Sequence, residues 1–504
     1  MAASRDGFHW TPSTGLQDGL PTIGLVQPAH FDAPCAAGHN YDVIVIGAGY
    51  AGLVAARDLT TQGKNVLVVE GRDRLGGRTW HSTIDGFNYE MGGTWIHWHM
   101  PHIYREVSLY GLHNDWLVTQ NPGSREDYFT VTAGSKQWAF THEEEDTVIG
   151  RVWEKFCNVD GNDLRETWKF AFGTGQSPEL LAQWDKVTCQ ERLEQIQSEL
   201  SPLDTAVLVA FLQQMGGASL DRMGLLNALH WWVLGTHEPL GLNRIALHTR
   251  LSCGHSELHR RIFTHARSTG RLSYRFNAAV THIKDMGNTT TVTTRDGSTY
   301  TASSVVCTVP LNVLSSIVFD PPLSMGKQAA ANAGQVNHCN KVHVDLRGPD
   351  YMSWTAFSSP GQGLICAIGD RLTPHNDSHM VSFGPDPSAE NGVQLNNIDG
   401  VKSAFLAMLP AEKRQEVVIN RIVSHDWNDD EFSKGTWCYL PVGTASKYLE
   451  ELQAPHGNIL FASADFSDGW RGWIDGAVQS GMQAAHRILT QPAESKSLWP
   501  AASL

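Results

Sequence analysis

The sequence predicts a mixed α/β (α+β) protein, and three observations along its 504 residues indicate this. Residues 41–46, YDVIVI, form a short apolar run that leads directly into glycine, as a buried parallel strand does before a tight turn. A helical pattern over 53–62 and a second apolar strand over 65–70 complete a β-α-β unit. Residues 458–489 again predict an apolar strand, a glycine-rich turn and a helix.

The chain between these units changes in character along its length. From about residue 140 to residue 265 the apolar pattern is mainly helical, for example over 225–234. Residues 271–309 alternate as strands do, with a turn at Asp296-Gly297, and residues 336–385 are again rich in strand formers. Strands and helices therefore both occur outside the β-α-β unit, which favours a second, mixed domain.

Composition excludes several classes of partner. The formal charge is −14, from 38 Lys and Arg against 52 Asp and Glu, so we expect neither nucleic acid nor membrane as a partner. No apolar run reaches the ~18 residues of a transmembrane helix, and the first residues lack the apolar stretch of a secretory signal. Eight scattered cysteines without a C-x-x-C pair predict reduced thiols in a soluble intracellular protein.

A glycine motif between the first predicted strand and helix indicates a dinucleotide site. Gly47, Gly49 and Gly52 form G-x-G-x-x-G, and Glu70 ends the second strand. In such a motif the first glycine allows a tight turn, the second lets a pyrophosphate approach the backbone, and the third lets helix and strand pack closely. The helix N-terminus attracts the phosphates, and the acid accepts hydrogen bonds from ribose hydroxyls.

The motif alone does not separate FAD from NAD, but three further features favour FAD. After Glu70 comes a glycine-arginine turn that would bring cations to the pyrophosphate. A second glycine-rich turn could lie against a flat ring, and the C-terminal block supplies an acid followed by a helix N-terminus. The residues concerned are Arg72, Gly77 and Arg78 in the first turn, Gly93, Thr94 and Trp95 in the second, and Asp465 and Ile474 in the C-terminal block.

A chain of motifs along nearly the whole sequence resembles the flavin-containing amine oxidase family, and most closely its soluble fungal monoamine oxidases. The motifs are S-R-D-G (4–7), W-T-P (10–12), D-V-I-V-I-G (42–47), E-M-G-G-T-W (90–95), H-W-W (230–232), V-P-L-N-V-L-S (309–315), K-V-H (341–343) and G-W-R-x-x-I-D-G-A (469–477).

The resemblance implies a division of the chain into domains. It implies a Rossmann-like FAD-binding domain built from discontinuous segments, namely 41–120, 245–320 and 430–490. A substrate-binding domain of mixed sheet and helices would come from 121–244 and 321–429. Residues 1–40, rich in Pro, Gly and Thr, would form an extended N-terminal arm, and 491–504 a C-terminal tail.

The resemblance also implies the roles of individual residues. Lys341 would hold a water beside flavin N5, and Trp437 and Trp473 would form an aromatic cage on the flavin face. Membrane-bound animal relatives attach flavin through a cysteine that is Thr436 here, so we expect non-covalent FAD. Val280 would be a further cofactor contact, and the implied substrate-pocket residues are Phe211, Gln213, Leu247, Asn337 and Pro385. We expect no metal.

The implied activity is that of an FAD-dependent monoamine oxidase. It would oxidise primary amines, with secondary amines as a further class, to imines that hydrolyse to aldehyde and ammonia. O2 would be reduced to H2O2, because a single dinucleotide fingerprint leaves no evident NAD(P)H site. The partners are then a small amine and O2, while a homo-oligomer is left open. The terminal Ala502-Ser503-Leu504 partly matches a peroxisomal signal, so the compartment is cytoplasmic or peroxisomal.

Three alternatives remain from the sequence. An L-amino acid oxidase needs a cation for the substrate carboxylate, for which Arg250, Arg260 and Arg261 are candidates. A polyamine oxidase needs acidic residues along its tunnel, for which Asp386 is a candidate. The third is a non-enzymatic flavoprotein that acts as an interaction partner.

Overall fold

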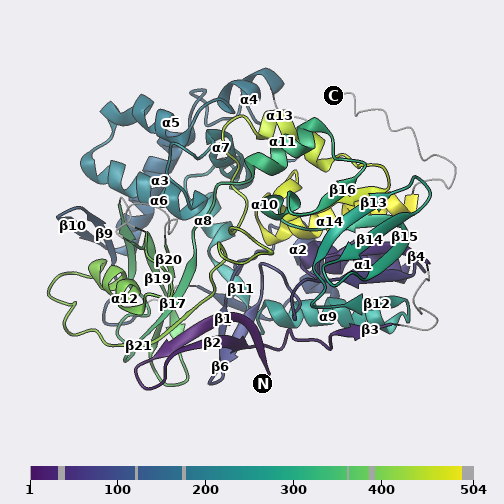
Figure 1. Cartoon of the computed structure of the whole chain (residues 1–504). Helices are drawn as coiled ribbons and strands as arrows, with labels where there is room; N and C mark the ends of the chain where they lie inside the picture. Colours follow the sequence, from purple (N-terminus) through teal and green to yellow (C-terminus); the bar gives the residue numbers. More distant parts are fainter. Residues whose placement is uncertain are drawn as a thin grey trace.

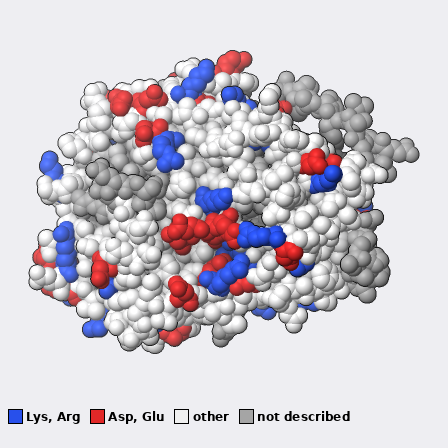
Figure 2. Space-filling model, in the orientation of Figure 1, with Lys and Arg blue, Asp and Glu red and all other residues white. Residues whose placement is uncertain are grey.

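The computed structural model describes residues 2–31, 40–119, 123–172, 177–359, 363–384 and 392–490. Two large sheets organise this part of the chain, one to the right and one to the lower left in Figure 1, with helices packed against both. Side chains of both charges gather near the centre of the face in Figure 2, and the rest of that face is mostly uncharged. No helix in the described ranges is long and apolar enough to cross a membrane.

The first sheet is built around parallel strands with the order β16-β13-β14-β15-β4-β5-β12-β3, and β22 also pairs with β15. Strand β4 is parallel to both β5 and β15. The carboxyl ends of these strands therefore meet at one edge, where α/β proteins bind ligands. The strands are β3 (Ala29–His30), β4 (Asn40–Ile46), β5 (Val66–Val69), β12 (Leu272–Arg275), β13 (Val280–Asp285), β14 (Thr290–Thr294), β15 (Thr299–Cys307), β16 (Val318–Asp320) and β22 (Ile459–Phe461).

The second sheet has the order β10-β9-β18-β19-β20-β17-β21-β1-β2 and is largely antiparallel. Its strands are β1 (Ala3–Thr11), β2 (Gly15–Pro21), β9 (Phe129–Ala133), β10 (Lys136–Phe140), β17 (Lys341–Leu346), β18 (Thr355–Ser358), β19 (Cys366–Leu372), β20 (Ser378–Phe383) and β21 (Ile419–Ser424). The described part of the predicted N-terminal arm pairs with both sheets: β1 pairs with β21 and β3 pairs with β12.

The helices lie in two groups. Those packed near the first sheet are α1 (Tyr50–Thr61), α2 (Pro101–Leu109), α9 (His255–Ser268), α10 (Leu311–Leu314), α11 (Met325–Ala333), α13 (Ala445–Gln453) and α14 (Ile474–Thr490). Those associated with the second sheet are α3 (His142–Cys157), α4 (Pro178–Trp184), α5 (Cys189–Ile196), α6 (Pro202–Gly216), α7 (Leu225–Leu234), α8 (Gly241–Ala246) and α12 (Ile398–Ala407). Two short two-stranded sheets complete the fold, the hairpin of β6 (His81–Ile84) with β7 (Phe87–Glu90) and the pair of β8 (Trp116–Val118) with β11 (Thr249–Leu251).

Helices α1 and α14 pack closely because glycine is present at their crossing. A Cβ added to Gly481 of α14 would stand 2.3 Å from the carbonyl oxygen of Ala51 in α1. Helix α1 is buried along most of its length, from Tyr50 to Thr60. The α1 position, and with it the edge of the first sheet, therefore depends on the absence of a side chain at residue 481.

We expect Gly481→Ala to lower the free energy of unfolding by about 1–3 kcal/mol, because the added methyl overpacks the helix contact. Urea denaturation of the purified protein measures this. The matched control is Gly326→Ala in α11, where the nearest atom is Glu451 Cγ at 3.1 Å on a side chain that can move. Equal losses in the two variants would contradict the close-packing argument.

Candidate active site

A cavity of about 480 Å³ begins at the carboxyl ends of β4, β5 and β15 and extends between helices α6, α7 and α8. We call its two ends the sheet lobe and the helix lobe. The sheet lobe is walled by the loops after those strands and by the starts of α1 and α14, including Gly47, Glu70, Thr308 and Ile474. The helix lobe is walled by Phe211, Gln214, Met215, Trp231, Leu242, Asn243, Ala246, Leu247, Cys339, Phe383, Trp437 and Trp473.

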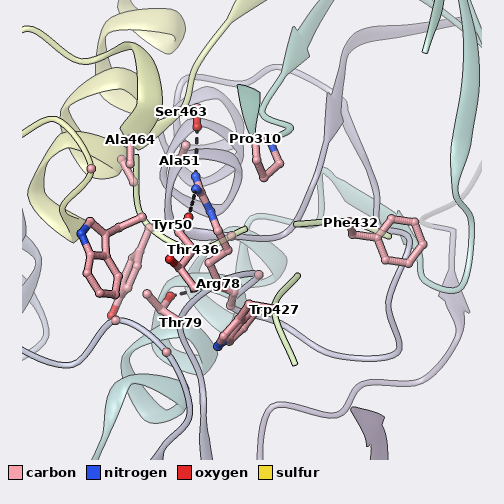
Figure 3. A pocket seen from close by; sticks show the side chains of 18 of the residues that line it. Tyr50, Ala51, Arg78, Thr79, Pro310, Trp427, Phe432, Thr436, Ser463 and Ala464 are labelled. Carbon is pink, nitrogen blue, oxygen red and sulfur yellow. Dashed lines mark hydrogen bonds between the residues drawn. The ribbon is translucent and has the colours of Figure 1, made fainter. Parts of the chain in front are cut away.

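The glycine motif gives the sheet lobe its shape. Gly47 has a φ of +104°, and a Cβ there would meet Thr308 Oγ1 at 2.5 Å. A Cβ on Gly52 would stand 2.0 Å from the Gly47 carbonyl oxygen. Helix α1 consequently starts directly after the turn, with no side-chain cap, and its first residues, Tyr50 and Ala51, line the cavity (Figure 3). The N-terminus of the helix is thus open to an anion.

Glu70 is held in one position at the end of β5. Its carboxylate accepts hydrogen bonds from the backbone N–H groups of Ala48 (2.6 Å) and Arg72 (2.8 Å). Glu70 is buried and lies on the cavity wall. The carboxylate is therefore oriented before any ligand enters.

Arg78 connects the sheet lobe to the C-terminal block (Figure 3). Its guanidinium donates to Asp465 Oδ1 at 2.7 Å and to the Thr436 carbonyl oxygen at 2.6 Å. The other oxygen of Asp465 accepts from the backbone N–H of Leu311 at 2.8 Å. Asp465 thus lies behind the wall and positions Arg78, which is itself on the wall.

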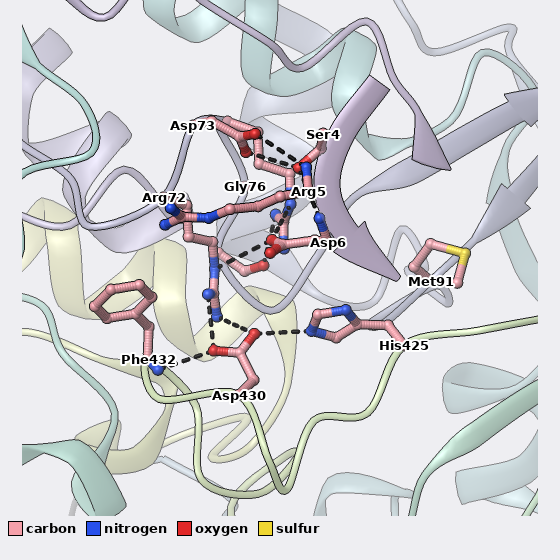
Figure 4. A network of polar contacts seen from close by, with 12 residues as sticks. Ser4, Arg5, Asp6, Arg72, Asp73, Gly76, Met91, His425, Asp430 and Phe432 are labelled. Atoms are coloured by element: carbon pink, nitrogen blue, oxygen red, sulfur yellow. Dashed lines mark hydrogen bonds and ion pairs between the residues drawn. The ribbon is translucent and has the colours of Figure 1, made fainter. Parts of the chain in front are cut away.

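Arg72 is fixed by residues from two distant segments (Figure 4). It bonds Asp430 at 2.8 Å, and His425 contacts the same carboxylate at 2.8 Å. Although burial opposes its ionisation, the neighbouring Arg72 and His425 hold the pKa of Asp430 at about 2. Asp6 of β1 bonds Arg74 at 2.8 Å and lies 3.9 Å from Arg72. The S-R-D-G segment therefore packs against the glycine-arginine turn.

The remaining predicted cofactor residues also lie around the sheet lobe. Gly49 is on the wall and bridges Gly76 of the arginine turn. The other members on the wall are Gly77, Gly93, Thr94, Trp95, Val280 and Ile474. Segments far apart in sequence are thus brought to one lobe.

Lys341 is the first residue of β17 and lies on the cavity wall. Its Nζ donates to the Gly92 carbonyl oxygen and to Thr94 Oγ1, both at 2.5 Å, and to the Glu90 carbonyl oxygen at 3.2 Å. The Trp95 ring centroid is 5.0 Å away. Burial lowers the pKa of Lys341 to about 7, against a smaller opposing effect of the Glu90 carboxylate.

A buried polar chain that sequence reasoning missed lies behind Lys341. His343 Nε2 contacts the Glu90 carbonyl oxygen at 2.9 Å, and His343 Nδ1 contacts His379 Nε2 at 3.1 Å. His379 Nδ1 is 2.7 Å from Asp345 Oδ1, and Tyr89 donates to Asp345 Oδ2 at 2.5 Å. The signal was present in the alternation Lys-x-His-x-Asp, because residues two apart on a strand share a face.

The two tryptophans of the predicted cage are each anchored to a helix of the helix lobe. Trp437 Nε1 donates to the Met215 carbonyl oxygen of α6 at 2.7 Å, and its ring stands at 89° to Phe383, 5.8 Å away. The Trp473 ring lies 5.5 Å from that of Trp231 in α7. Both tryptophans line the helix lobe.

The predicted pocket residues divide into two groups. Phe211 and Leu247 are on the wall of the helix lobe, whereas the described wall includes Gln214 in place of Gln213. The correction follows from helix geometry, because residues three apart, such as Phe211 and Gln214, share a face and residues two apart do not. Asn337 is buried behind the wall, where its Oδ1 accepts from Thr436 Oγ1 at 2.8 Å. Pro385 lies outside the described residues.

Sequence reasoning also missed Met215, Trp231, Asn243, Cys339 and Phe383 as wall residues. Helix spacing from Phe211 could have found Met215, but the others depend on tertiary packing.

The arginines considered for an amino acid carboxylate have other partners. Arg250 and Asp370 form a buried ion pair. Arg260 and Arg261 both bond Glu257 on their own helix, at 2.9 Å. None of the three is among the described wall residues.

Comparison with known proteins gives consistent results. The family model described as "Flavin containing amine oxidoreductase" matches residues 50–489. Nicotine dehydrogenase of Pseudomonas putida is 30% identical over 93% of this chain and 92% of its own length. Pseudooxynicotine dehydrogenase of Pseudomonas sp. is 29% identical over 90% and 87%. Amine oxidase [flavin-containing] B of Bos taurus is 25% identical over 89% and 86%.

Solved structures share the fold. Cyclohexylamine oxidase from Brevibacterium oxydans superposes with a TM-score of 0.71 at 20% identity, covering 89% of this chain and 99% of its own. Putrescine oxidase bound to putrescine superposes with a TM-score of 0.70 at 22% identity, covering 90% and 100%.

The low pKa of Lys341 predicts a pH-dependent stability. Between its pKa of about 7 in the folded protein and its ordinary value of about 10.4 in the unfolded chain, only the unfolded chain binds the proton. The contribution of Lys341 to stability therefore rises with pH across that window and is least favourable below it. We expect Lys341→Met to gain most in urea resistance over the wild type near about pH 6, with a smaller gain near about pH 9.

The control for this measurement is Lys136→Met, an exposed lysine of β10. The urea resistance of this variant should equal that of the wild type at both pH values. If the gain in urea resistance over the wild type depended on pH in the same way in both variants, the buried amine of Lys341 would not be the cause of that dependence.

Proposed function

The chain belongs to the family of flavin-containing amine oxidoreductases, and we propose that within it the protein is an FAD-dependent monoamine oxidase. It would oxidise primary amines to imines, which hydrolyse to aldehyde and ammonia, and reduce O2 to H2O2. Secondary amines are a further class, whose imines would release a primary amine in place of ammonia. The observation that carries this proposal is the continuity of the two lobes, with the buried Lys341 and the two tryptophans lining the same cavity.

The residues of the sheet lobe fit FAD. The uncapped start of α1 offers backbone N–H groups to a pyrophosphate, and the start of α14 lines the same lobe. The fixed carboxylate of Glu70 suits ribose hydroxyls, and the cations of Arg72 and Arg78 face the lobe. When bound, FAD would accept the hydrogen and two electrons removed from the amine and transfer the electrons to oxygen.

The helix lobe would select the neutral form of an amine. Its described walls are mostly aromatic and aliphatic, so they disfavour an ammonium ion and lower the pKa of a bound amine. The faces of Trp437 and Trp473 present electron-rich surfaces to the substrate. Those rings would orient the C–N bond and exclude water around it.

Lys341 is suited to hold and exchange a proton near neutral pH, because its pKa is about 7. All three of its present partners are protein oxygens. To hold a water, Nζ would release one of them, and the Glu90 carbonyl at 3.2 Å is the most distant.

The alternatives have less support. An L-amino acid oxidase requires a cation in the helix lobe, and no arginine is present among its described wall residues. A polyamine oxidase requires carboxylates there, and the described wall residues of that lobe include none. Asp386, the candidate from the sequence, lies outside the described residues.

The first experiment is peroxide release by the purified protein. The panel contains a simple alkylamine, benzylamine, spermine and an L-amino acid, with nicotine added because two relatives are named for nicotine compounds. We expect turnover of the simple amines. If only spermine or only the amino acid is turned over, the substrate is a polyamine or an amino acid rather than a monoamine. If the protein binds flavin but releases no peroxide with any of these compounds, the non-enzymatic alternative is favoured.

Acid precipitation should release the flavin into the supernatant as FAD. Thr436 takes the place of an attaching cysteine, and burial raises the pKa of the nearby Cys438 thiol well above its usual value. A yellow pellet would contradict non-covalent binding, and mass spectrometry of its peptides would locate the attachment.

Lys341→Met should slow reoxidation of the flavin by oxygen by at least about tenfold and flavin reduction by amine far less. The reason is that the variant removes a buried wall amine whose pKa of about 7 lets it hold and exchange a proton at the junction of the lobes. Stopped flow measures the two half-reactions separately. Equal losses in both would overturn this role.

A further inference from the structure

The helix lobe contains two primary amides in a wall that is otherwise hydrocarbon, aromatic, thioether or thiol among the described residues. Gln214 is on α6 and Asn243 is on α8. Gln214 is buried, with 7% of its surface exposed. Such a residue is unusual in an apolar wall, because an amide loses its hydrogen bonds to water there.

Neither amide is used by the protein itself. Within the described ranges, the side chains of Gln214 and Asn243 make no hydrogen bond, whereas Asn337 just behind the wall accepts from Thr436 and from the Cys339 backbone. The enclosed amide atom without a partner on α6 is Oε1 of Gln213. The Gln214 amide borders the helix lobe instead, where a bound molecule can reach it.

Gln214 is also close to the predicted cage in the chain. The next residue, Met215, accepts the indole N–H of Trp437 through its carbonyl oxygen at 2.7 Å. Phe211, Gln214 and Met215 share one face of α6 by their spacing of three and four, and all three line the lobe. The amide thus belongs to the same wall that anchors one ring of the cage.

We propose that Gln214 binds a neutral hydrogen-bonding group on the amine substrate other than the reacting amine itself. The substrate class is then an amine with a second polar group, such as a hydroxyl, a carbonyl oxygen or a ring nitrogen, rather than a plain hydrocarbon amine. The group is neutral because the lobe has no charged side chain among its described wall residues. This inference rests on the proposed amine oxidation.

The size of the effect follows from hydrogen bonding. A primary amide donates and accepts, so it can pair with any of these groups. A site built to bond a polar group discriminates against the analogue that lacks it, because its own buried group is then left unpaired. One net hydrogen bond corresponds to a preference of about tenfold.

The experiment uses two matched pairs of amines with the FAD-loaded protein. The pairs are 2-phenylethylamine with 2-(4-hydroxyphenyl)ethylamine, and 3-phenylpropylamine with 3-(pyridin-3-yl)propylamine. Anaerobic stopped flow gives the Kd and the limiting rate of flavin reduction for each. The wild type should prefer the polar member of at least one pair by about tenfold or more.

Gln214→Met keeps the length of the side chain and removes the amide. In this variant the Kd of the polar member should rise until the two members of a pair bind about equally well. The Kd of the apolar member should stay the same or fall. The matched control is Gln213→Met on the same helix, which is not among the described wall residues and should keep the wild-type preference. Gln214→Leu replaces the variant if the methionine form does not retain flavin.

The outcomes separate the two proposals. The role of Gln214 would be overturned if the wild type bound and oxidised both members of each pair equally well. It would also be overturned if the Gln214 variants kept the wild-type preference. In both cases the proposed amine oxidation would stand. Loss of the preference in Gln213→Met as well would also overturn the role of Gln214, since the effect would then belong to the helix as a whole. A flavin reduced by none of the four amines would instead overturn the proposed function.

Discussion

The burial of the Lys341 amine is the constraint on which the arrangement of the site depends. Lys341 starts a central strand of the second sheet, and its partners, Glu90, Gly92 and Thr94, belong to the turn that walls the sheet lobe. An ammonium removed from water is stable only when its donors are all satisfied, so this turn and the start of β17 must stay in contact. The second sheet is thereby fixed against this part of the cavity wall. The lowered pKa of the amine is the consequence of this burial.

The chain of side chains behind Lys341 maintains that turn without adding a charge to it. A carbonyl oxygen can only accept, so His343 Nε2 carries a proton and donates it to the Glu90 carbonyl. The hydrogen bond between His343 and His379 requires a second proton, and the one between His379 and Asp345 requires a third. Three protons on two imidazoles and one carboxylate leave the group without net charge. Burial and the adjacent His379 keep the pKa of His343 well below its usual value, so the ring that contacts the Glu90 carbonyl stays neutral. The Glu90 carbonyl is thus oriented by a neutral cluster.

Sequence reasoning succeeded where the physical constraint is local. The family and the α/β fold follow from motifs such as Gly47 and Gly52, because backbone contacts a few residues apart require glycine wherever the turn occurs. The boundaries were less certain: the helix predicted from residue 53 begins at Tyr50, because the turn itself supplies its start. Gln213 was implied by the family resemblance in place of Gln214, although helix spacing from Phe211 favours Gln214. The contact of Asp6 with Arg74 joins residues 68 apart and has no local signal at all.

The two lobes differ in whether their polar side chains already have hydrogen-bond or ion-pair partners in the protein, and this difference suggests that the lobes have different roles. In the sheet lobe Glu70 is held by backbone N–H groups, Arg72 by Asp430 and Arg78 by Asp465. A lobe in which each of these charges is already compensated can form before its ligand binds, which reduces the ordering cost of binding. In the helix lobe the amide of Gln214 lines the cavity and makes no hydrogen bond in the described chain, so it can pair with water or a ligand. The proposed cofactor would then bind in a completed lobe, and the proposed choice among amines would be made in an incomplete one.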